Sequence, residues 1–334
     1  MDFDLNEEQK EIKGVAHELL AARSPFSKVR EAADRAAYDP ALWQELVELG
    51  WPGIAVSAEN GGQGLGAVEL SVLVEELGYA CAATPYLSTA AAAVVIEATG
   101  TPEQRSKWLP GLASGEQTAG LGPRELVADA NDAAVILLLD GDDATLIDRA
   151  DADVEELVTI DPTRRFATVS GEGEPLSSGA ADRARIAIAS ELIGVCQRAL
   201  DMTLEFVKDR KQFGVPVGSF QAVAHRCAQM LLGTESIRSA AYFAAWAADA
   251  DPDRLSEGAA LAAAAAADNG REVTGSAIQA HGGIGFTWEA DVHWLYKRAQ
   301  LDAALLGGAR RHRASLARLG SARVRSAEGA AAAR

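Results

Sequence analysis

The stretch ARIAIASELIGVCQRALDMTLEFVKDRKQFGVPVGSFQ, residues 184–221, decides the fold of this chain. Its apolar residues recur every three or four positions, which is the period of one face of an α-helix. The pattern stops at Gly214 and Pro216, residue types that break helices. One long helix followed by a turn is therefore expected. The apolar stripe consists of Ile188, Leu192, Val195, Ala199, Met202 and Phe206.

Three more helices are expected after this turn, over residues 220–247, 255–280 and 289–306. Long antiparallel helices of this kind usually pack into a bundle. Residues 181–320 are therefore expected to form a C-terminal four-helix bundle. Residues 1–119 also carry helical patterns and are expected to form an N-terminal helical domain.

The segment 120–180, between the two helical parts, has a different texture. A short apolar run, AAVILLL at 133–139, precedes the turn signal DGDD, and 144–147 and 166–169 are further strand candidates. The expected fold class is therefore mostly α with a small β module, a reduced middle β domain. The last residues, 321–334, contain Ala, Ser and Arg without an apolar stripe and are expected to form a flexible tail.

Composition excludes several classes of protein. Lys and Arg number 31 against 48 Asp and Glu, a net charge of −17, which argues against nucleic-acid binding because that needs clustered cations. The three cysteines form neither a disulfide framework nor a metal motif, so we expect no metal and a reducing, cytoplasmic setting. The polar start, MDFDLNEEQK, is not a signal peptide, and the Ala-rich runs are too short to span a membrane.

Four segments, in the right order, resemble the acyl-CoA dehydrogenase family. DRKQFGVPVGSFQ, 209–221, is similar to the family's R-x-x-F-G loop and following F-Q, and QAHGGIGFTWE, 279–289, is similar to its Q-x-x-G-G-x-G turn. The stretch 46–66 with EELG at 75–78 resembles the N-terminal pattern, and DPTRR, 161–165, a segment of the middle domain. The resemblance covers nearly the whole chain. It implies an acyl-CoA dehydrogenase-like fold, FAD as cofactor, acyl-CoA as substrate and electron-transfer flavoprotein as acceptor.

In this family each FAD is shared, with its ring held by one subunit and its adenosine pyrophosphate held by the bundle of a neighbour. By resemblance, Arg210 is the pyrophosphate-binding residue, and a guanidinium fork suits phosphate oxygens. Glycine in the second motif lets backbone N–H groups approach the cofactor. The implied cofactor-binding residues are Arg210, Gln212, Phe213, Gln221, Gln279, Gly282 and Gly283.

Asp182 and Arg185 match a family pair that contacts bound acyl-CoA at the start of the bundle. The distance in sequence from Arg185 to Arg210 is 210 − 185 = 25 residues, the same register as in the family. The resemblance therefore implies that Asp182 and Arg185 are substrate-binding residues.

The chain departs from the family where the flavin ring is bound. The family's middle domain has a T-E-P-x-A-G-S-D-like segment followed by a strand with a W-[IVF]-[TS] motif. Here residues 118–132 read TAGLGPRELVADAND, which keeps Pro123 but lacks both the Gly-Ser part and the Trp-Thr strand. The middle domain is also much smaller than is usual in the family.

The catalytic base is missing from its commonest place. Gly307 stands where the family often has the Glu that removes the α-proton, and glycine cannot take a proton. Some members carry the Glu on a helix before the G-G turn, and Asp268 falls at that register, with Glu272 a less suitable rival. Asp268 is read as a weak base, as a remnant without a role, or as the N-cap of a helix around Asn269. No residue is therefore assigned as the catalytic base.

Together these features resemble the shortened subunit of actinobacterial heterotetrameric (α2β2) acyl-CoA dehydrogenases. The implied function is α,β-dehydrogenation of an acyl-CoA thioester, a steroid side chain or another bulky acyl group. A full-length partner subunit would supply the flavin-ring site and the base. Two alternatives stay open: a self-sufficient homo-oligomeric dehydrogenase that uses Asp268 as base, and a non-catalytic acyl-CoA-binding or scaffold protein on the same fold.

Overall fold

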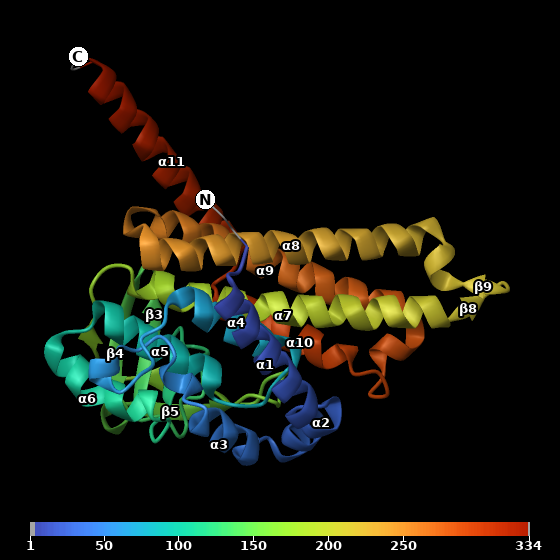
Figure 1. Ribbon diagram of the computed structural model, residues 1–334, viewed down its shortest axis with the longest axis horizontal. Coiled ribbons are helices and arrows are strands. Elements are labelled where there is room, and N and C mark those ends of the chain that lie inside the picture. Colours follow the sequence, from blue (N-terminus) through green and yellow to red (C-terminus); the bar gives the residue numbers. More distant parts are fainter. Residues whose placement is uncertain (1–3, 333–334) are drawn as a thin grey trace.

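The computed structural model describes the backbone of residues 4–332 and the side chains of residues 4–322. The chain begins with a helical domain that packs along one side of the long C-terminal helices (Figure 1). Asn6 caps the first helix, since its side chain accepts a hydrogen bond from the Gln9 backbone and the Gln9 side chain accepts one from the Asn6 backbone. The helices of this domain are α1 (Glu7–Arg23), α2 (Phe26–Arg35), α3 (Pro40–Glu48), α4 (Ala67–Tyr79), α5 (Tyr86–Thr99) and α6 (Pro102–Ala113).

The middle domain is, within the described residues, a seven-stranded sheet with the order β5-β6-β2-β1-β3-β4-β7. Strands β1 and β3 are parallel, and the other neighbours are antiparallel. The strands are β1 (Ala119–Gly122), β2 (Val127–Ala128), β3 (Val135–Asp140), β4 (Asp143–Asp148), β5 (Asp153–Leu157), β6 (Phe166–Ser170) and β7 (Glu174–Pro175).

Strand β3 is apolar without alternation because both faces of the sheet are buried at this point. Val135 and Leu137 belong to the main core, which β3 shares with the helices. Ile136 and Leu138 point to the opposite face and join a smaller cluster with residues of β2, β4 and β6. Helix α5 packs against β1 on the main-core side, where Thr89 Oγ1 accepts a hydrogen bond from the Ala119 backbone at 3.2 Å. The sheet is therefore attached to the helical body through one face.

The C-terminal domain is the expected bundle, which confirms the mostly helical fold class. The predicted apolar stripe faces its interior: Ile188, Leu192 and Val195 are fully buried. Within residues 4–332, no helix combines the length and apolar character needed to cross a lipid bilayer. The bundle helices are α7 (Ala180–Asp209), α8 (Gln221–Ala250), α9 (Leu255–His281) and α10 (Val292–Leu305).

A last helix, α11 (Ala309–Ala332), projects from the bundle (Figure 1). The backbone of residues 321–332 is thus helical rather than irregular, although the sequence predicted a flexible tail over 321–334. Alanine and arginine are strong helix formers, so the helix continues without an apolar face to bury. Residues 333–334 lie outside the described residues, and both the flexibility of this segment and the domain boundaries stay predictions.

Helices α4 and α7 cross so closely that only glycine fits at the contact. A Cβ atom on Gly194 would lie 1.8 Å from the Glu75 carbonyl oxygen and 2.5 Å from the Tyr79 nitrogen. A Cβ atom on Gly78 would lie 2.2 Å from the Glu191 carbonyl oxygen. This backbone contact joins the N-terminal domain to the bundle and sets the position of Glu191.

We expect Gly194→Ala to destabilise the protein by about 3 kcal/mol, because overpacking at a backbone contact forces the two helices apart. Gly14→Ala is the matched control: Gly14 lies in the exposed middle of α1, and its added Cβ would meet nothing within 4 Å. That control should be neutral or stabilising by up to about 1 kcal/mol. Urea unfolding of both variants checks the difference, and equal stabilities would contradict the close crossing.

Candidate functional site

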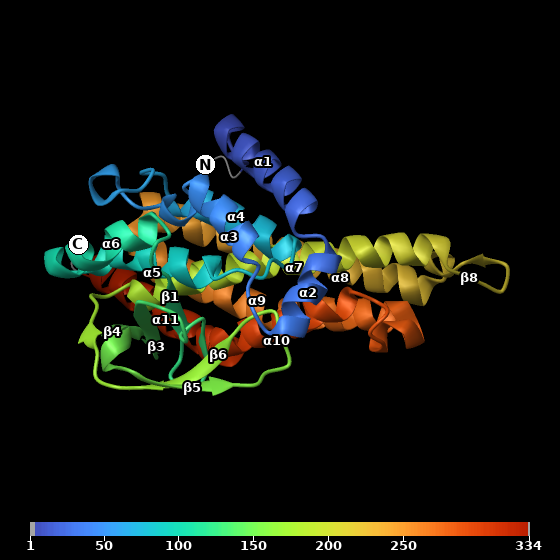
Figure 2. The same ribbon diagram turned by 90° about the horizontal axis from the view of Figure 1, so that it is seen from below.

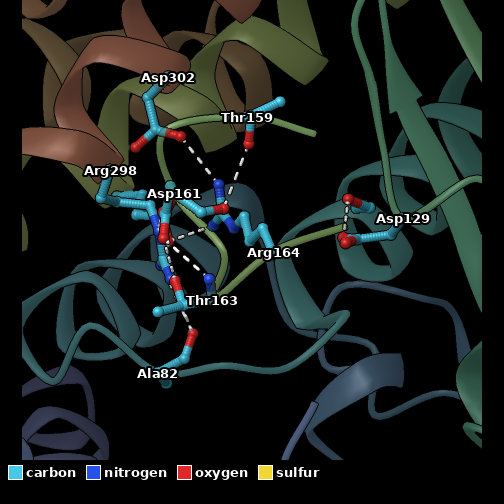
Figure 3. Close-up of polar contacts among 10 residues, drawn as sticks. Ala82, Asp129, Thr159, Asp161, Thr163, Arg164, Arg298 and Asp302 are labelled. Atoms are coloured by element: carbon cyan, nitrogen blue, oxygen red, sulfur yellow. Dashed lines mark hydrogen bonds and ion pairs between the residues drawn. The ribbon is translucent and has the colours of Figure 1, made fainter. Parts of the chain in front are cut away.

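A buried charge cluster joins the three domains (Figure 3). Arg298 of α10 is fully buried, and it donates hydrogen bonds to Asp161 Oδ2 at 2.8 Å, Glu191 Oε1 at 3.0 Å and Thr163 Oγ1 at 2.7 Å. Asp161 and Thr163 come from the loop between β5 and β6, and Glu191 comes from α7. We call the following six residues the buried charge cluster: Asp161, Thr163, Arg164, Glu191, Arg298 and Asp302.

Arg164 completes the cluster with a second pair of contacts. Its Nη1 donates to Asp302 Oδ1 at 2.8 Å, and its Nη2 forms an ion pair with Glu191. The guanidinium of Arg298 also points toward the Ala82 carbonyl oxygen in the segment between α4 and α5, at 3.4–3.5 Å. The cluster therefore contacts all three domains at one point.

The cluster holds two guanidinium groups and three carboxyl groups, so full ionisation would leave one unpaired buried negative charge. Burial raises the pKa of Asp302 well above its ordinary value, and the nearby charge of Glu191 raises it further. Burial also opposes ionisation of Glu191, but Arg164 and Arg298 hold the pKa of Glu191 below its usual range. Asp302 is therefore protonated and Glu191 ionised, which makes the cluster neutral overall.

Gly307 lies just beyond α10, whose last turn carries Asp302 of the cluster. The Asp302 carbonyl accepts a hydrogen bond from the Leu306 backbone at 3.0 Å, and Gly307 and Gly308 follow with φ of +75° and +78°. The ring Nε2 of His312, from α11, lies 2.6 Å from the Leu306 carbonyl oxygen. At Gly307 a Cβ atom would meet nothing within 4 Å. The predicted base position is thus an exposed left-handed turn between α10 and α11.

Asp268 lies inside α9, which runs without interruption from Leu255 to His281. The reading of Asp268 as a helix N-cap is therefore wrong. The alanines at 259–267 have high helix propensity and carry the helix through this position. The Asp268 carboxylate forms a partly exposed ion pair with Arg313 of α11.

Asp182 and Arg185, the predicted substrate contacts, line a cavity of about 780 Å³ between α7, α9, α11 and the β3–β4 turn. Asp182 accepts hydrogen bonds from Arg185 Nη1 at 3.0 Å and from Ser256 Oγ at 2.7 Å. Arg185 also donates to the Gly141 carbonyl and lies 3.5 Å from Asp142. Both predicted residues therefore line one cavity and are bonded to each other.

The predicted cofactor-binding residues of the first motif lie on a small hairpin at the far end of α7. Arg210 follows the last residue of α7, is exposed, and forms no ion pair with a carboxylate among residues 4–322. The hairpin strands are β8 (Lys211–Gln212) and β9 (Val215–Pro216), so Gln212 is the residue before its turn. Phe213 has φ of +52° and is 93% exposed, with its ring 6.2 Å from that of Phe220.

The second motif, residues 279–289, lies at the same end of the bundle as the first motif, residues 209–221 (Figures 1 and 2). The rings of Phe206 and His281 stack at 4.5 Å, which holds the C-terminal turn of α7 against that of α9. Gln279 is exposed in the last turn of α9, and Gln221 is exposed as the first residue of α8. Gly282 follows with φ of +66° and ψ of −141°, a conformation largely restricted to glycine.

This arrangement fits the pyrophosphate and adenosine parts of FAD. Arg210 offers an exposed guanidinium, and Cβ atoms added to Gly282 or Gly283 would meet nothing within 4 Å, so a ligand can approach the backbone there. The first backbone N–H groups of α8 have no side-chain cap at Phe220, and such groups attract anions. All seven predicted residues therefore lie in the hairpin, at the start of α8 or at the end of α9.

The buried charge cluster was not predicted from the sequence. DPTRR was noticed only through its resemblance to the family, and Arg298 was not assigned a role. A signal was present, because Glu191 and Asp302 interrupt apolar stretches that form the buried faces of their helices. A charge on a buried helix face needs a partner of opposite sign.

Comparisons with known proteins agree with this geometry. The family model for the acyl-CoA dehydrogenase N-terminal domain matches residues 6–116, and that for the acyl-CoA dehydrogenase C-terminal domain matches residues 171–320. The chain is 35% identical to acyl-CoA dehydrogenase IpdE2 of Mycolicibacterium smegmatis over 308 residues, which cover 91% of this chain and 96% of IpdE2. The chain belongs to the acyl-CoA dehydrogenase family, and this membership supports an oxidoreductase activity.

Two solved structures share the fold over almost their whole length. One is a variant of the Tcur3481–Tcur3483 steroid ACAD, with a TM-score of 0.84, 29% identity, and coverage of 97% of this chain and 99% of that one. The other is the ChsE4–ChsE5 complex from Mycobacterium tuberculosis, with a TM-score of 0.84, 25% identity, and coverage of 96% and 98%. The fold of this chain, with its helical, β and helical domains, is therefore that of the family.

We expect the free energy of unfolding of the wild type to fall relative to that of Asp302→Asn as pH rises. An unfolded Asp titrates near about pH 3.9, whereas folded Asp302 keeps its proton to much higher pH. Across that window the folded wild type binds one proton more than the unfolded chain, so wild-type stability falls as pH rises. Asn imitates the protonated carboxyl group and removes this loss.

Denaturant unfolding between about pH 5 and pH 9 measures the effect. Asp34→Asn, an exposed change on α2, is the control and should run parallel to the wild type. A constant difference between Asp302→Asn and the wild type across this range would mean that Asp302 is ionised in the folded protein.

Proposed function

We propose that this chain is the shortened subunit of a heteromeric FAD-dependent acyl-CoA dehydrogenase. It supplies the adenosine-pyrophosphate half of an FAD site whose ring lies in a full-length partner. The observation that carries the proposal is the exposed Arg210 at the same end of the bundle as the open Gly282–Gly283 turn, in a chain that has Gly307 at the base position.

The length of α7 supports a shared cofactor. Arg185 and Arg210 are 210 − 185 = 25 residues apart along this helix, which corresponds to about 37 Å at 1.5 Å per residue. A flavin ring is joined to its pyrophosphate by only a ribityl chain, which is far shorter. A cofactor held by Arg210 therefore cannot place its ring at the cavity beside Arg185, so the two ends of this helix serve different active sites.

The residues at the Arg210 end would hold the cofactor without reacting with it. The guanidinium fork of Arg210 suits two phosphate oxygens, and the glycine backbone at 282–283 allows a close approach. The exposed amide side chains of Gln221 and Gln279 have the donors and acceptors to bind ribose or adenine edges. Bound FAD would supply the hydride acceptor.

The reaction also needs a carboxylate within hydrogen-bond reach of the thioester's α-proton. Gly307 has no side chain to take it, and the Asp268 carboxylate is paired with Arg313. Asp182 in the cavity is paired with Arg185. The partner subunit is therefore assigned the base as well as the flavin ring.

The substrate class is an acyl-CoA thioester with a bulky acyl group such as a steroid side chain. The likeness to a steroid ACAD, at 29% identity over 97% of this chain, supports a steroid substrate. The likeness to the ChsE4–ChsE5 complex supports assembly with a second kind of subunit. Electron-transfer flavoprotein is proposed as the acceptor and the cytoplasm as the location.

The first test is flavin retention after co-expression with each full-length acyl-CoA dehydrogenase of the source genome. The chain alone should bind little FAD, and the complex should be yellow. Arg210→Ala should weaken FAD retention by about ten- to a hundredfold, because a charge-assisted contact is worth about 1.5–3 kcal/mol. Arg210→Lys should restore it only in part, since lysine lacks the fork.

Arg35→Ala is the control for this test, because Arg35 is exposed on α2 and contacts only Glu31, through a 3.6 Å ion pair and a 3.1 Å hydrogen bond from Nε to the Glu31 carbonyl. A yellow, active protein from this chain alone would favour the homo-oligomeric alternative. Absence of flavin both with and without partners would favour a non-catalytic scaffold.

We also expect Asp268→Asn to leave the turnover of the complex nearly unchanged, because the base lies in the partner. Gly307→Glu should create no second active site, since the segment that seats the ring is missing. It should also cost about 1–2 kcal/mol of stability, because Glu is strained at φ of +75°. Steady-state reduction of an electron acceptor measures both variants. Loss of activity in Asp268→Asn, with folding and flavin intact, would identify Asp268 as the base.

A further inference from the structure

A second pocket lies on the outer face of the turn that carries Gly282 and Gly283. It has a volume of about 410 Å³ and lies between the end of α9, the short helix Gly282–Phe286 and the first turns of α10. Phe286 and Trp288 form part of its wall and are 75% and 72% exposed. Large aromatic side chains at this exposure are typical of surfaces that another molecule covers.

The wall of this pocket and the residue next to it contain buried polar groups without a hydrogen-bond partner among the described residues. His293 is 9% exposed, and neither ring nitrogen has a hydrogen-bond partner among the described residues. The same holds for Nε1 of the neighbouring Trp294, which is 5% exposed. Buried polar groups are normally hydrogen-bonded, so an unsatisfied histidine beside an unsatisfied indole indicates an incomplete surface.

Aromatic contacts hold these groups in place. The His293 ring lies 4.9 Å from that of Trp288 and 4.3 Å from that of Trp294. Burial, with the positive charge of Lys297, lowers the pKa of His293 to about 4. The ring is therefore neutral near pH 7, with one N–H donor and one nitrogen acceptor.

Lys297 places a positive charge at the same pocket. Its Nζ lies 4.1 Å from the ring centre of Trp288 and 4.5 Å from that of Trp294. No carboxylate in residues 4–322 forms an ion pair with it. An ammonium group held on two ring faces, without a direct ion pair, is complementary to an incoming carboxylate.

The pocket is continuous with the proposed cofactor half-site. The glycine turn contributes Gly282 and Gly283 to that site and Gly285 and Phe286 to the pocket wall. A Cβ atom on Gly285 would lie 2.4 Å from the Ile278 carbonyl oxygen, so the turn is packed tightly onto α9. A partner subunit that brings FAD to the half-site on one side of this turn therefore lies next to the pocket on its other side.

We propose that this pocket is a docking site for the full-length partner subunit, and that its occupant is an Asp or Glu side chain flanked by an apolar residue. The carboxylate pairs with Lys297, while the apolar neighbour packs on Trp288 and Phe286. The inference rests on the proposed function, because that function requires the partner to lie at this end of the bundle.

The test measures the affinity between the purified wild-type partner and variants of this chain. We expect Trp288→Ala and Lys297→Glu each to raise the dissociation constant by about 30-fold or more, the range of interface hot spots. Lys107→Glu is the matched control: Lys107 also lies over an indole ring, at 4.3 Å from Trp108, but it is already paired with Asp148. The control should stay within about twofold of the wild type.

Hydrogen exchange provides a second measurement that does not depend on any variant. The peptide covering residues 284–297 should gain protection when the wild-type complex forms. Thermal unfolding of each isolated variant shows that it is folded.

Three outcomes would overturn the proposal. If the complex forms and retains FAD, but both variants bind normally and the peptide gains no protection, the docking site is wrong while the proposed function stands. If the wild type pairs with none of the full-length dehydrogenases, both fall together. If both variants instead dissociate a self-associated form of this chain, the occupant is a second copy of the chain and not a different partner.

Discussion

The buried Arg298 guanidinium is the interaction on which the rest of this structure depends. It is fully excluded from water, so its charge must be met by groups that the fold brings to it. Those groups come from α7 and from the β5–β6 loop, with the Ala82 carbonyl of the N-terminal domain nearby. Removing one partner of such a buried pair typically costs about 3–5 kcal/mol. The domains therefore keep their relative placement only while the buried charge cluster is electrically neutral. That neutrality needs a proton on Asp302.

The sequence was sufficient to predict the helices that are buried on one face and the strand that is buried on both faces. The stripe from Ile188 to Phe206 predicted α7 because its helical period shows which side is covered. The run Val135–Leu139 predicted β3 because a short continuous apolar run is typical of a strand that is buried on both faces. Strand β1, with the sequence AGLG, was missed because glycine and alanine have low strand propensity, and it is a strand only through its tertiary pairing with β2 and β3. Strand β5 was missed because DVEEL is an acidic, partly exposed edge strand without an apolar pattern.

The candidate site shows the same limit at the level of side chains. Motif spacing was enough to select Arg210 and Gly282 separately, but their meeting at one end of the bundle depends on the Phe206–His281 stack, which no sequence spacing reveals. The buried charge cluster was missed for a related reason. A charged residue in a helix is read as exposed unless its partner is known, and Glu191 and Arg298 are 107 residues apart.

The turn at Gly307, where the sequence predicts that a catalytic base is absent, is structurally separate from the groups that stabilise this part of the fold. Gly307 is exposed and its left-handed backbone contributes no side-chain contact, whereas Asp302, five residues earlier, is fully buried in the cluster. A change at position 307 therefore leaves the contacts that hold α10 in place untouched. The end of the bundle that carries Arg210 lies at the other end of α7 and is equally independent of this turn. The turn at Gly307 and the end of the bundle that carries Arg210 therefore depend on different packing interactions, so one can change without disturbing the other.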